Sequence, residues 1–418
     1  MGHLAAKDIY RKLGKKIDGI AMRAPWNEHL YAILKELYTK DEAELVVKMP
    51  YGLHRADKIE RVTGIEGAAL KKLLDGLGSK GLIVDVWDGR EYRYTISPFI
   101  IGIFEFTMMR TRGELNYREW AHLFYDYLHD GNSFYHANFG HGEKISPLRA
   151  LPYEDAIEES QYVEVLDYEK ASSIIEQSDK FAIGICSCRH EKMHLGEKRC
   201  DIPLETCSTF GAATDYVIRN GLAREASKEE MLDNLARSKE TGLVLCADNI
   251  KNDISFICHC CGCCCNVLLG ISQFGYPNAL VTSNYIAKSD SDACIECGTC
   301  ALSCPINAIE MPSEGAPQIN EDICIGCGVC GLNCDTGAMR LVKREQRVYH
   351  PETMFERVIL SNLERGTLQN LLFDNPNNTG HKFMRGLVGG FLRLPPVKKA
   401  LMSDGLRSRF LDRLRRDR

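Results

Sequence analysis

The chain has 418 residues, of which 44% are hydrophobic and 26% are charged, and its formal net charge is −5. This composition is typical of a globular protein with roughly two to four domains, and it excludes a small disulfide scaffold, a disordered chain and a collagen. The longest apolar stretch, residues 99–109, contains Glu105 and is shorter than the ~20 residues that span a bilayer. Residues 1–16 carry six charged side chains with no apolar core after them, so they do not resemble a secretory signal, and we expect a cytoplasmic protein.

Nineteen cysteines are distributed unevenly along the chain. In a reducing compartment cysteines serve as metal ligands more often than as disulfides, because thiolates bind soft metals well. None precedes Cys186, eleven lie between Cys186 and Cys265, and eight lie between Cys294 and Cys334. We therefore expect a metal-free front, a metal-rich middle and a cysteine-free tail.

The front of the chain shows helical periodicity followed by a hairpin pattern. Apolar spacing predicts helices over 27–38 and 42–48, and a helix-turn-helix pair over 56–62 and 66–77. Residues 82–86 and 92–96 read as two strands around a turn at Asp88-Gly89, which predicts a β-hairpin. Helices followed by such a hairpin resemble the winged-helix fold.

Winged helices often bind DNA, so a regulator must be weighed against a docking module. Between Lys40 and Ile96, ten Lys and Arg are balanced by ten Asp and Glu, whereas groove binding needs a positive footprint. The second helix of the pair begins with Glu66, Gly67 and Ala68, which are poor in side chains that reach base edges. We favour a protein-docking or scaffold role and no nucleic-acid partner.

The middle of the chain mixes predicted strands and helices. Strands are expected at 162–166, 181–186, 243–246 and 254–258, and helices after Asp167 and over 208–219. Ser227 and Glu230 form a capping box that predicts the start of another helix. Three of the strands end in cysteine, at Cys186, Cys246 and Cys258, so we expect the ligands to gather at one edge of an α+β domain.

The first cysteine group begins with the pattern C-x-C-R-H. If this segment is extended, alternation puts Cys186 and Cys188 on one side. We predict one metal centre, a 4Fe-4S cluster in preference to zinc or to unligated thiols, with the ligands Cys186, Cys188, Cys200 and Cys207. Arg189 is expected either as a counter-charge to the cluster or as a surface arginine paired with Glu191. His190 and His194 are not expected to be ligands.

The second group places six thiols within residues 258–265, with Cys246 upstream. In an extended segment they would alternate between two sides, unless Gly262 breaks the regularity. One cluster is expected here, and its predicted ligands are drawn from Cys258, Cys260, Cys261, Cys263 and Cys264, with Cys246 left open. The surplus of thiols would suit a fused or non-cubane cluster, or a disulfide-active pair.

The most specific pattern is C-x2-C-x2-C-x3-C-P at residues 294–305, which repeats without the proline at residues 324–334. Three cysteines at this spacing wrap one cluster, and the fourth reaches the neighbouring cluster. Zinc sites normally use two C-x2-C pairs, so two 4Fe-4S clusters are favoured.

This segment resembles the bacterial two-cluster ferredoxins. The resemblance implies one cluster on Cys294, Cys297, Cys300 and Cys334, and another on Cys324, Cys327, Cys330 and Cys304. Gly298, Gly326 and Gly328 would supply the flexible backbone and the amides of the cluster loops. Asp335 replaces the second proline and would add negative charge beside a cluster.

The tail carries most of the positive charge. Residues 381–418 contain eleven Lys and Arg against three Asp and Glu, a net charge of +8, which leaves −13 for residues 1–380. Apolar residues recur between these cations, so the tail is expected to be helical. It could meet an anionic membrane surface or an acidic partner, or pack on its own acidic body, which we favour.

As a whole, the chain is similar to the multi-cluster ferredoxin-domain proteins of strict anaerobes. We expect a multidomain α+β protein with a winged-helix-like domain at 1–110, a cysteine-rich α+β domain at 111–288, a ferredoxin domain at 289–345 and a basic tail at 346–418. The resemblance implies a non-catalytic electron-transfer component of a larger oxidoreductase system, with two 4Fe-4S clusters, one or two further iron-sulfur clusters, and a redox protein as partner. The alternatives are a reductase with a catalytic centre at residues 258–265 and a redox-sensing regulator.

Overall fold

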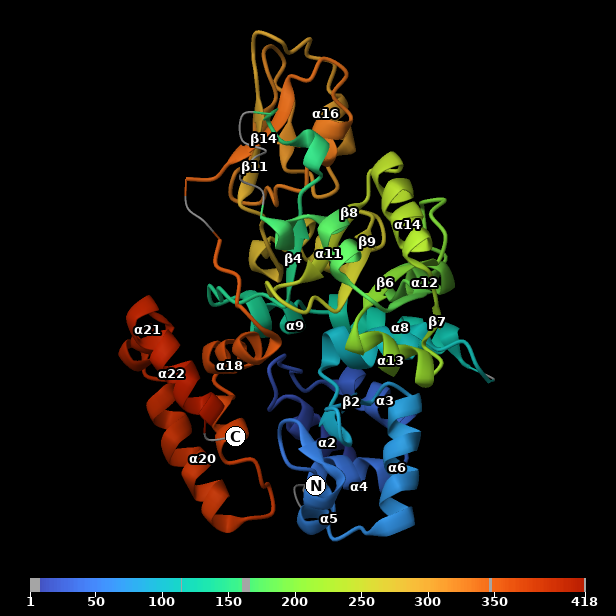
Figure 1. The fold of residues 1–418 in the computed structure, drawn as a ribbon, viewed down its shortest axis with the longest axis vertical. Helices are drawn as coiled ribbons and strands as arrows, with labels where there is room; N and C mark the ends of the chain where they lie inside the picture. Colours follow the sequence, from blue (N-terminus) through green and yellow to red (C-terminus); the bar gives the residue numbers. More distant parts are fainter. Residues whose placement is uncertain (1–7, 114, 160–165, 346–347, 417–418) are drawn as a thin grey trace. The chain divides into compact units, whose positions relative to one another are not determined.

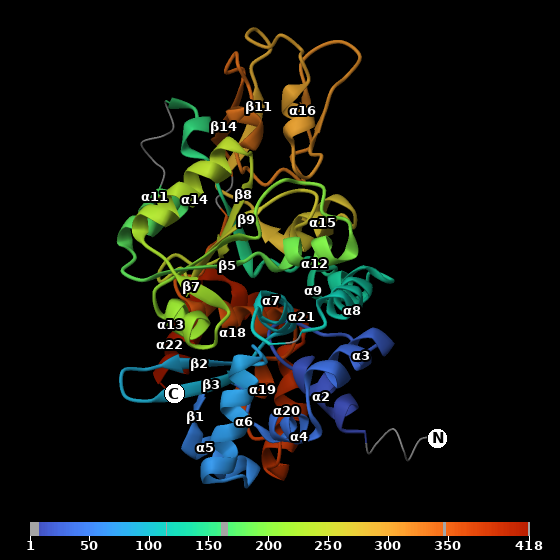
Figure 2. The same cartoon turned by 90° about the vertical axis from the view of Figure 1, so that its right-hand side faces the viewer.

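The computed structural model describes residues 8–113, 115–159, 166–345 and 348–416, and Figures 1 and 2 show it from two sides. The chain forms two compact units, one made of residues 1–145 and 354–418 and the other of residues 146–353. Within the described ranges, no helix combines the length and the apolar character that crossing a bilayer requires. Helices and small sheets are mixed along the chain, as expected of an α+β, multidomain protein.

The front of the first unit contains the predicted helices and the predicted hairpin. Its elements are α2 (Ile9–Ile17), α3 (Glu28–Leu37), α4 (Lys40–Lys48), β1 (His54–Arg55), α5 (Ala56–Thr63), α6 (Gly67–Ser79), β2 (Ile83–Trp87) and β3 (Tyr92–Ile96). The strands form an antiparallel sheet in the order β1-β3-β2. Thr39 and Glu42 form a capping box at the start of α4, and Gly64 ends α5 in the left-handed conformation.

Aromatic side chains build the next part of this unit. A π turn at Phe99–Ile103 leads into α7 (Phe104–Met109), α8 (Tyr117–His129) and α9 (Ser133–Phe139). The Phe99 ring lies 4.5 Å from that of Tyr127 and 5.7 Å from that of Phe134, measured between centroids. These buried rings hold the irregular turn in place.

The tail is helical and has a core of its own. It comprises α18 (Met354–Glu364), α19 (Leu368–Leu372), α20 (Thr379–Leu392), α21 (Pro395–Met402) and α22 (Asp404–Arg416). Leu392 and Leu411 are buried against Ile359, Leu363 and Leu368. The basic tail therefore packs partly on helices of its own unit.

The second unit is built on a seven-stranded sheet in the order β10-β4-β8-β9-β6-β5-β7. The strands are β4 (Leu148–Leu151), β5 (Phe181–Ile185), β6 (Glu205–Phe210), β7 (Ala223–Glu225), β8 (Val244–Asp248), β9 (Phe256–Cys260) and β10 (Leu280–Val281). Only β10 and β4 pair in parallel among these strands. The helices are α11 (Ala171–Gln177), α12 (Ser187–Leu195), α13 (Ala212–Arg219), α14 (Lys228–Glu240) and α15 (Asn266–Ser272), with short 3-10 turns at 154–156, 167–169 and 277–279. Figure 2 shows α11 and α14 side by side.

Two expectations for this sheet need correction. The helix predicted over 208–219 begins only at Ala212, because residues 205–210 form a strand and Gly211, with φ of 57°, separates the two. Cys246 and Cys258 lie within β8 and β9 and not at their ends, since each strand runs two residues further. The strand predicted at 162–166 lies almost wholly outside the described residues. The capping box of Ser227 and Glu230 is confirmed at the start of α14.

The last part of the second unit holds the doubled cysteine motif. Strands β11 (Tyr285–Ser289) and β14 (Met339–Lys343) pair antiparallel, as do β12 (Ile309–Glu310) and β13 (Gln318–Ile319). The short helices α16 (Thr299–Ser303) and α17 (Val329–Leu332) carry Cys300 and Cys330. Each half of the sequence repeat therefore forms a loop followed by one short helix.

Candidate metal centres

The doubled motif is repeated in the backbone as well as in the sequence. Glu296 and Gly326 hold the same place in the two C-x2-C pairs, and their φ angles are 57° and 62°. Gly298 and Gly328 precede α16 and α17 with φ angles of 76° and 85°. The left-handed turns that the predicted glycines allow are therefore present, and their role in holding a cluster remains a prediction.

Packing explains why one of these places needs glycine and the other accepts glutamate. A Cβ at Gly326 would lie 2.1 Å from the backbone oxygen of Tyr285 and 2.4 Å from Ser283 Oγ. The first loop has more room: at Gly298, two residues after Glu296, a Cβ would have Met311 Cγ at 3.7 Å as its nearest neighbour. Glu296 is exposed, so its side chain has room. The second loop is thus pressed against β11, and the first loop is not.

Four thiols of the doubled motif line one cavity. They are Cys304, Cys324, Cys327 and Cys330, the set that the ferredoxin resemblance assigns to one cluster. The other walls are mostly apolar and include Ile306, Ile309, Ile325 and Leu341. Burial, followed by the charge of neighbouring thiols, raises the pKa of Cys330 to about 12 and that of Cys327 well above its usual value. These thiols need a bound metal to become thiolates near neutral pH.

The other set of the motif is more exposed. Cys294 and Cys297 lie close enough to Cys300 for their charges to raise its pKa. The charge of Asp335, the residue after Cys334, acts on the pKa of Cys297 in the same direction. The hydroxyl of Thr299 lies 3.3 Å from Cys297 Sγ and, through this hydrogen bond above all, lowers the pKa of Cys297. Thr336 likewise stands two residues after a predicted ligand, and its Oγ1 lies 3.6 Å from Cys334 Sγ.

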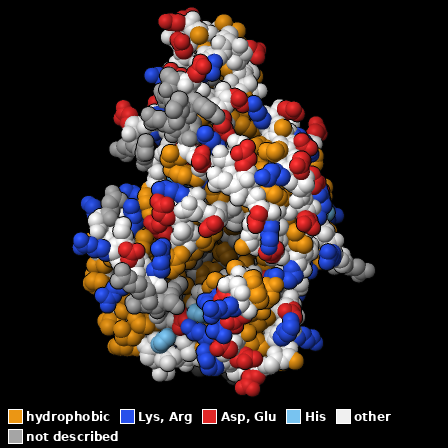
Figure 3. Space-filling model, in the orientation of Figure 1, with side chains coloured by type: hydrophobic (Ala, Val, Ile, Leu, Met, Phe, Trp, Pro, Cys, Tyr) orange, Lys and Arg blue, Asp and Glu red, His pale blue; other side chains and the backbone are white. Residues whose placement is uncertain are grey.

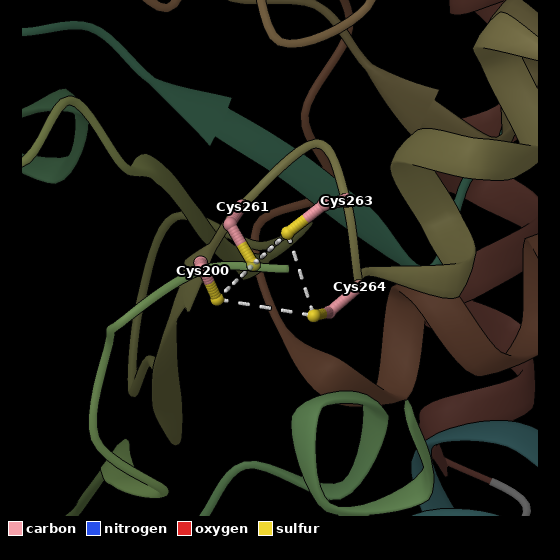
Figure 4. Close-up of side chains that lie close together, drawn as sticks. All are labelled: Cys200, Cys261, Cys263 and Cys264. Atoms are coloured by element: carbon pink, nitrogen blue, oxygen red, sulfur yellow. Dashed lines mark hydrogen bonds between the residues drawn. The ribbon is translucent and has the colours of Figure 1, made fainter. Parts of the chain in front are cut away.

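A second kind of site lies in the sheet domain. The thiols of Cys200, Cys261, Cys263 and Cys264 all lie within 4.8 Å of one another and form the four-thiol site shown in Figure 4. The Cys200 sulfur is 3.7 Å from that of Cys261 and 3.9 Å from that of Cys264, and Cys263 lies 3.6 Å from Cys261 and 3.5 Å from Cys264. The structure thus brings Cys200 together with the second cysteine group and not with Cys186, Cys188 and Cys207.

A turn after β9 creates this arrangement. The backbone leaves the strand after Cys260, and the amide of Cys265 donates to the Cys261 carbonyl at 3.1 Å. The expected alternation of thiols is therefore wrong beyond Cys260, because the segment is no longer extended. Gly262 lies so close to Pro305 that a Cβ there would come within 2.4 Å of the Pro305 carbonyl oxygen. The turn is thus packed on the doubled motif, beside Cys304.

Arg189 lies next to the four-thiol site. Its side chain is fully buried, so the alternative of a surface arginine is wrong. Its guanidinium donates to Thr206 Oγ1 at 2.6 Å, to the His259 carbonyl at 2.7 Å and to Cys261 Sγ at 3.7 Å. Burial alone would lower the pKa of Arg189, but the nearby thiolates, Cys186 and Cys261 first, outweigh it and raise the pKa. In turn, a hydrogen bond from Cys264 and the charge of Arg189 lower the pKa of Cys261. The role of Arg189 as a counter-charge to a cluster remains a prediction.

Seven further thiols gather on one face of the sheet, and we name them the sheet-face thiols: Cys186, Cys188, Cys207, Cys246, Cys258, Cys260 and Cys265. Cys246 and Cys258 are opposite each other on paired strands. The pKa values of these thiols depend on one another, through Cys207 and Cys258, Cys258 and Cys260, Cys260 with both Cys246 and Cys265, and Cys265 and Cys188. Cys186 interacts electrostatically with Cys188 and Cys207. Cys188 lies in α12, so the expected extended segment at 186–188 is wrong.

The histidines near these thiols have other partners. His259 points to the opposite face of the sheet, where its ring nitrogens lie 2.6 Å from Ser238 Oγ and 3.1 Å from Asn234 Nδ2 on α14. Burial, and then Arg189, lowers the pKa of His259 to about 3, so the ring is neutral. His190 and His194 lie 2.9 Å apart between their Nε2 atoms.

Sequence reasoning missed two of the gathered thiols as ligand candidates. Cys265, the N-cap of α15, is not among the predicted ligands, and the prediction leaves Cys246 open. The pairing of Cys246 with Cys258 needs the register of β8 and β9, which the sequence does not state. Cys258 and Cys260 are two residues apart, and this spacing on a strand indicates that their side chains share a face.

Comparison with known proteins agrees with the doubled motif. Residues 293–347 match the family model of the 4Fe-4S dicluster domain. No curated protein and no solved structure matches the chain. The chain is thus an iron-sulfur protein that carries a ferredoxin-like domain in its second unit.

Proposed function

We propose that this chain transfers single electrons through a series of iron-sulfur centres. Two 4Fe-4S clusters would be held by the doubled motif, and a third centre by the sheet-face thiols. Iron-sulfur clusters with cysteine ligands accept and release electrons without a substrate pocket. No dinucleotide or phosphate-binding fingerprint occurs in the sequence, so another subunit would have to bind such a substrate. We therefore infer that the chain is a component of a larger oxidoreductase system.

One contact carries this proposal. The amide of Tyr153 donates to the carbonyl of Cys327 at 3.0 Å, and its hydroxyl donates to the carbonyl of Leu243 at 2.6 Å, at the start of β8. Burial raises the pKa of Tyr153, and the thiols of Cys327 and Cys246 act on the pKa in the same direction. Tyr153 therefore lies between one ligand set of the doubled motif and the sheet-face thiols, so centres at the two places would be neighbours.

The chain's own residues would tune these centres. Backbone amides donate to three predicted ligand sulfurs, from Glu296 to Cys294 at 3.4 Å, from Ala308 to Cys304 at 3.2 Å and from Met339 to Cys334 at 3.3 Å. Such hydrogen bonds stabilise the anionic reduced state and raise the reduction potential. The exposed Asp335 carboxylate would lower the potential of the adjacent cluster.

The sheet-face thiols also favour a second candidate function, a reductase with its catalytic centre there. A single cubane uses four thiolates, whereas seven thiols are gathered, and Cys186, Cys188, Cys207 and Cys258 are only partly buried. A fused or non-cubane cluster with an open iron site would serve this function. Spectra of ordinary four-cysteine cubanes throughout would exclude it.

The tail offers a docking place for the redox partner. On α20, Phe383, Leu387 and Phe391 are exposed by 70%, 61% and 58%, and they recur every four residues along one side of the helix. Figure 3 shows apolar side chains gathered over α20 and α22. The exposed cations Lys382 and Arg393 flank this stripe. We propose that it binds an acidic redox protein, and the front helices and hairpin, which we interpret as a winged-helix-like domain, would serve as scaffold.

Anaerobic reconstitution with iron and sulfide, followed by redox titration, tests the electron-transfer proposal. We expect at least about twelve irons per chain and paramagnetic signals after dithionite reduction. Cys327→Ser should lose iron from the doubled motif, and Cys258→Ser should lose iron from the sheet face only. Fewer than about eight irons in the intact chain would contradict the proposal.

A further inference from the structure

The sulfur positions of the four-thiol site fit a single metal ion. Four of the six sulfur–sulfur distances are between 3.5 and 3.9 Å, and all six are within 4.8 Å. Four sulfurs at about 2.3 Å from a zinc ion form a tetrahedron with edges of about 3.8 Å. A four-iron cubane places an iron atom between each thiolate and the cluster centre, so its thiolates must stand farther apart.

The same chain provides an internal comparison. Within the described part of the chain, the four-thiol site is the one group whose metal-binding atoms all lie within 4.8 Å of one another. The cavity set Cys304, Cys324, Cys327 and Cys330 lines one cavity together with apolar side chains and does not form such a compact group. The two kinds of site therefore differ in size, and the compact one is suited to a smaller occupant.

We propose that Cys200, Cys261, Cys263 and Cys264 bind one structural Zn²⁺ ion. Four thiolates outweigh the two charges of the ion, and the buried Arg189, which donates to Cys261 Sγ at 3.7 Å, offsets the excess. The backbone carbonyl of Cys200 accepts a hydrogen bond from the Lys198 ammonium, which brings a second positive charge to this ligand residue. A tetrahedral all-sulfur site with no open position is typical of structural zinc.

The fold indicates what such an ion would do. Cys200 lies in the loop between α12 and β6, and the other three ligands lie in the turn after β9, 61 residues or more further along the chain. Leu243 and Ile202 pack around these thiols and form a small apolar cluster with them. Zinc would tie the loop to the turn and keep Gly262 against Pro305. It would hold the sheet domain against the ferredoxin-like domain without carrying electrons itself.

Metal analysis of matched variants tests the proposal. The chain is produced anaerobically with zinc and iron both supplied, and zinc and iron are counted per chain. We expect one zinc per chain, lost in Cys263→Ser and in Cys200→Ser with iron unchanged. Cys258→Ser, a sheet-face variant, is the control and should keep its zinc while losing iron. X-ray absorption at the zinc edge should show four sulfurs at about 2.3 Å.

Three results would overturn the assignment. Loss of about four irons in Cys263→Ser without loss of zinc would show a cubane at this place. Unchanged zinc and iron in both variants would show that these thiols bind no metal. Nitrogen or oxygen ligands at the zinc edge would place the ion elsewhere. The electron-transfer proposal fails separately, through a low iron content of the intact chain.

Discussion

Alanine at Gly326 tests whether packing against β11 holds the second cluster loop. Gly326 has φ of 62°, and a Cβ there would lie 2.1 Å from the Tyr285 carbonyl oxygen and 2.4 Å from Ser283 Oγ. The left-handed conformation costs alanine about 1–2 kcal/mol. The contact with a backbone oxygen cannot be relieved by rotating a side chain, so the loop must move, at a further cost of about 1–3 kcal/mol. The total loss in the free energy of unfolding should be about 2–5 kcal/mol.

Gly298→Ala is the matched control. This glycine lies in the first cluster loop directly before α16 and is left-handed like Gly326, with φ of 76°, and a Cβ there would meet nothing nearer than Met311 Cγ at 3.7 Å. It should therefore show the conformational cost alone, about 1–2 kcal/mol. The difference between the two variants isolates the contact with Tyr285 and Ser283.

The assay is anaerobic urea unfolding of the iron-loaded protein, followed through the visible absorption of the clusters. Gly326→Ala should lose its clusters at lower urea than Gly298→Ala and should retain about four irons fewer after desalting. Equal unfolding midpoints and equal iron contents in the two variants would refute the argument that packing holds this loop.

Three further predictions concern single features of the fold. Burial, then Arg149 and Lys251, lowers the pKa of His350 to about 3, so the unfolded chain takes up this proton below pH 6.5 while the folded chain does not. Stability should fall by about 1.4 kcal/mol between pH 7.5 and 5.5 through this residue, and urea titrations of His350→Gln should lack that share. Arg189→Gln removes a buried cation with several hydrogen bonds, so it should lower the free energy of unfolding by about 2–4 kcal/mol. It should also speed the extraction of metal from the four-thiol site by a chelator. An unchanged extraction rate would argue against the role of Arg189 as a counter-charge. Deleting residues 381–418 should leave the iron content unchanged, because the predicted ligands lie in the other unit, while thermal unfolding of the first unit moves to lower temperature; loss of iron would contradict this.

Short-range patterns predicted their structures well. The helices over 27–38 and 56–77, the hairpin at 82–96 and the capping box at Ser227 depend on neighbouring residues, and each is present. The helix predicted from residue 208 was wrong at its start, because Ser208, Thr209 and Phe210 are held in the sheet by pairing with β5 and β9. Pairing with distant strands overrides local preference, and no local pattern reports it.

The extended geometry assumed around the cysteines failed for the same reason. Cys188 is helical because α12 starts directly after Cys186, and the thiols after Cys260 follow a turn that packs on Pro305. The alternation rule was sound for Cys258 and Cys260, which lie on a strand. It could not apply where the backbone changes direction.

The doubled cysteine motif was determined by the sequence alone, since three of the predicted ligands of each cluster lie within a few residues of one another and their spacing shapes the loop. The grouping of the other eleven thiols was decided only by the tertiary structure. Strand register brings Cys246 to Cys258, and the turn after β9 carries Cys261 to Cys200 across 61 residues of chain. Thiols are chemically alike, so only their positions in space select which of them share a metal.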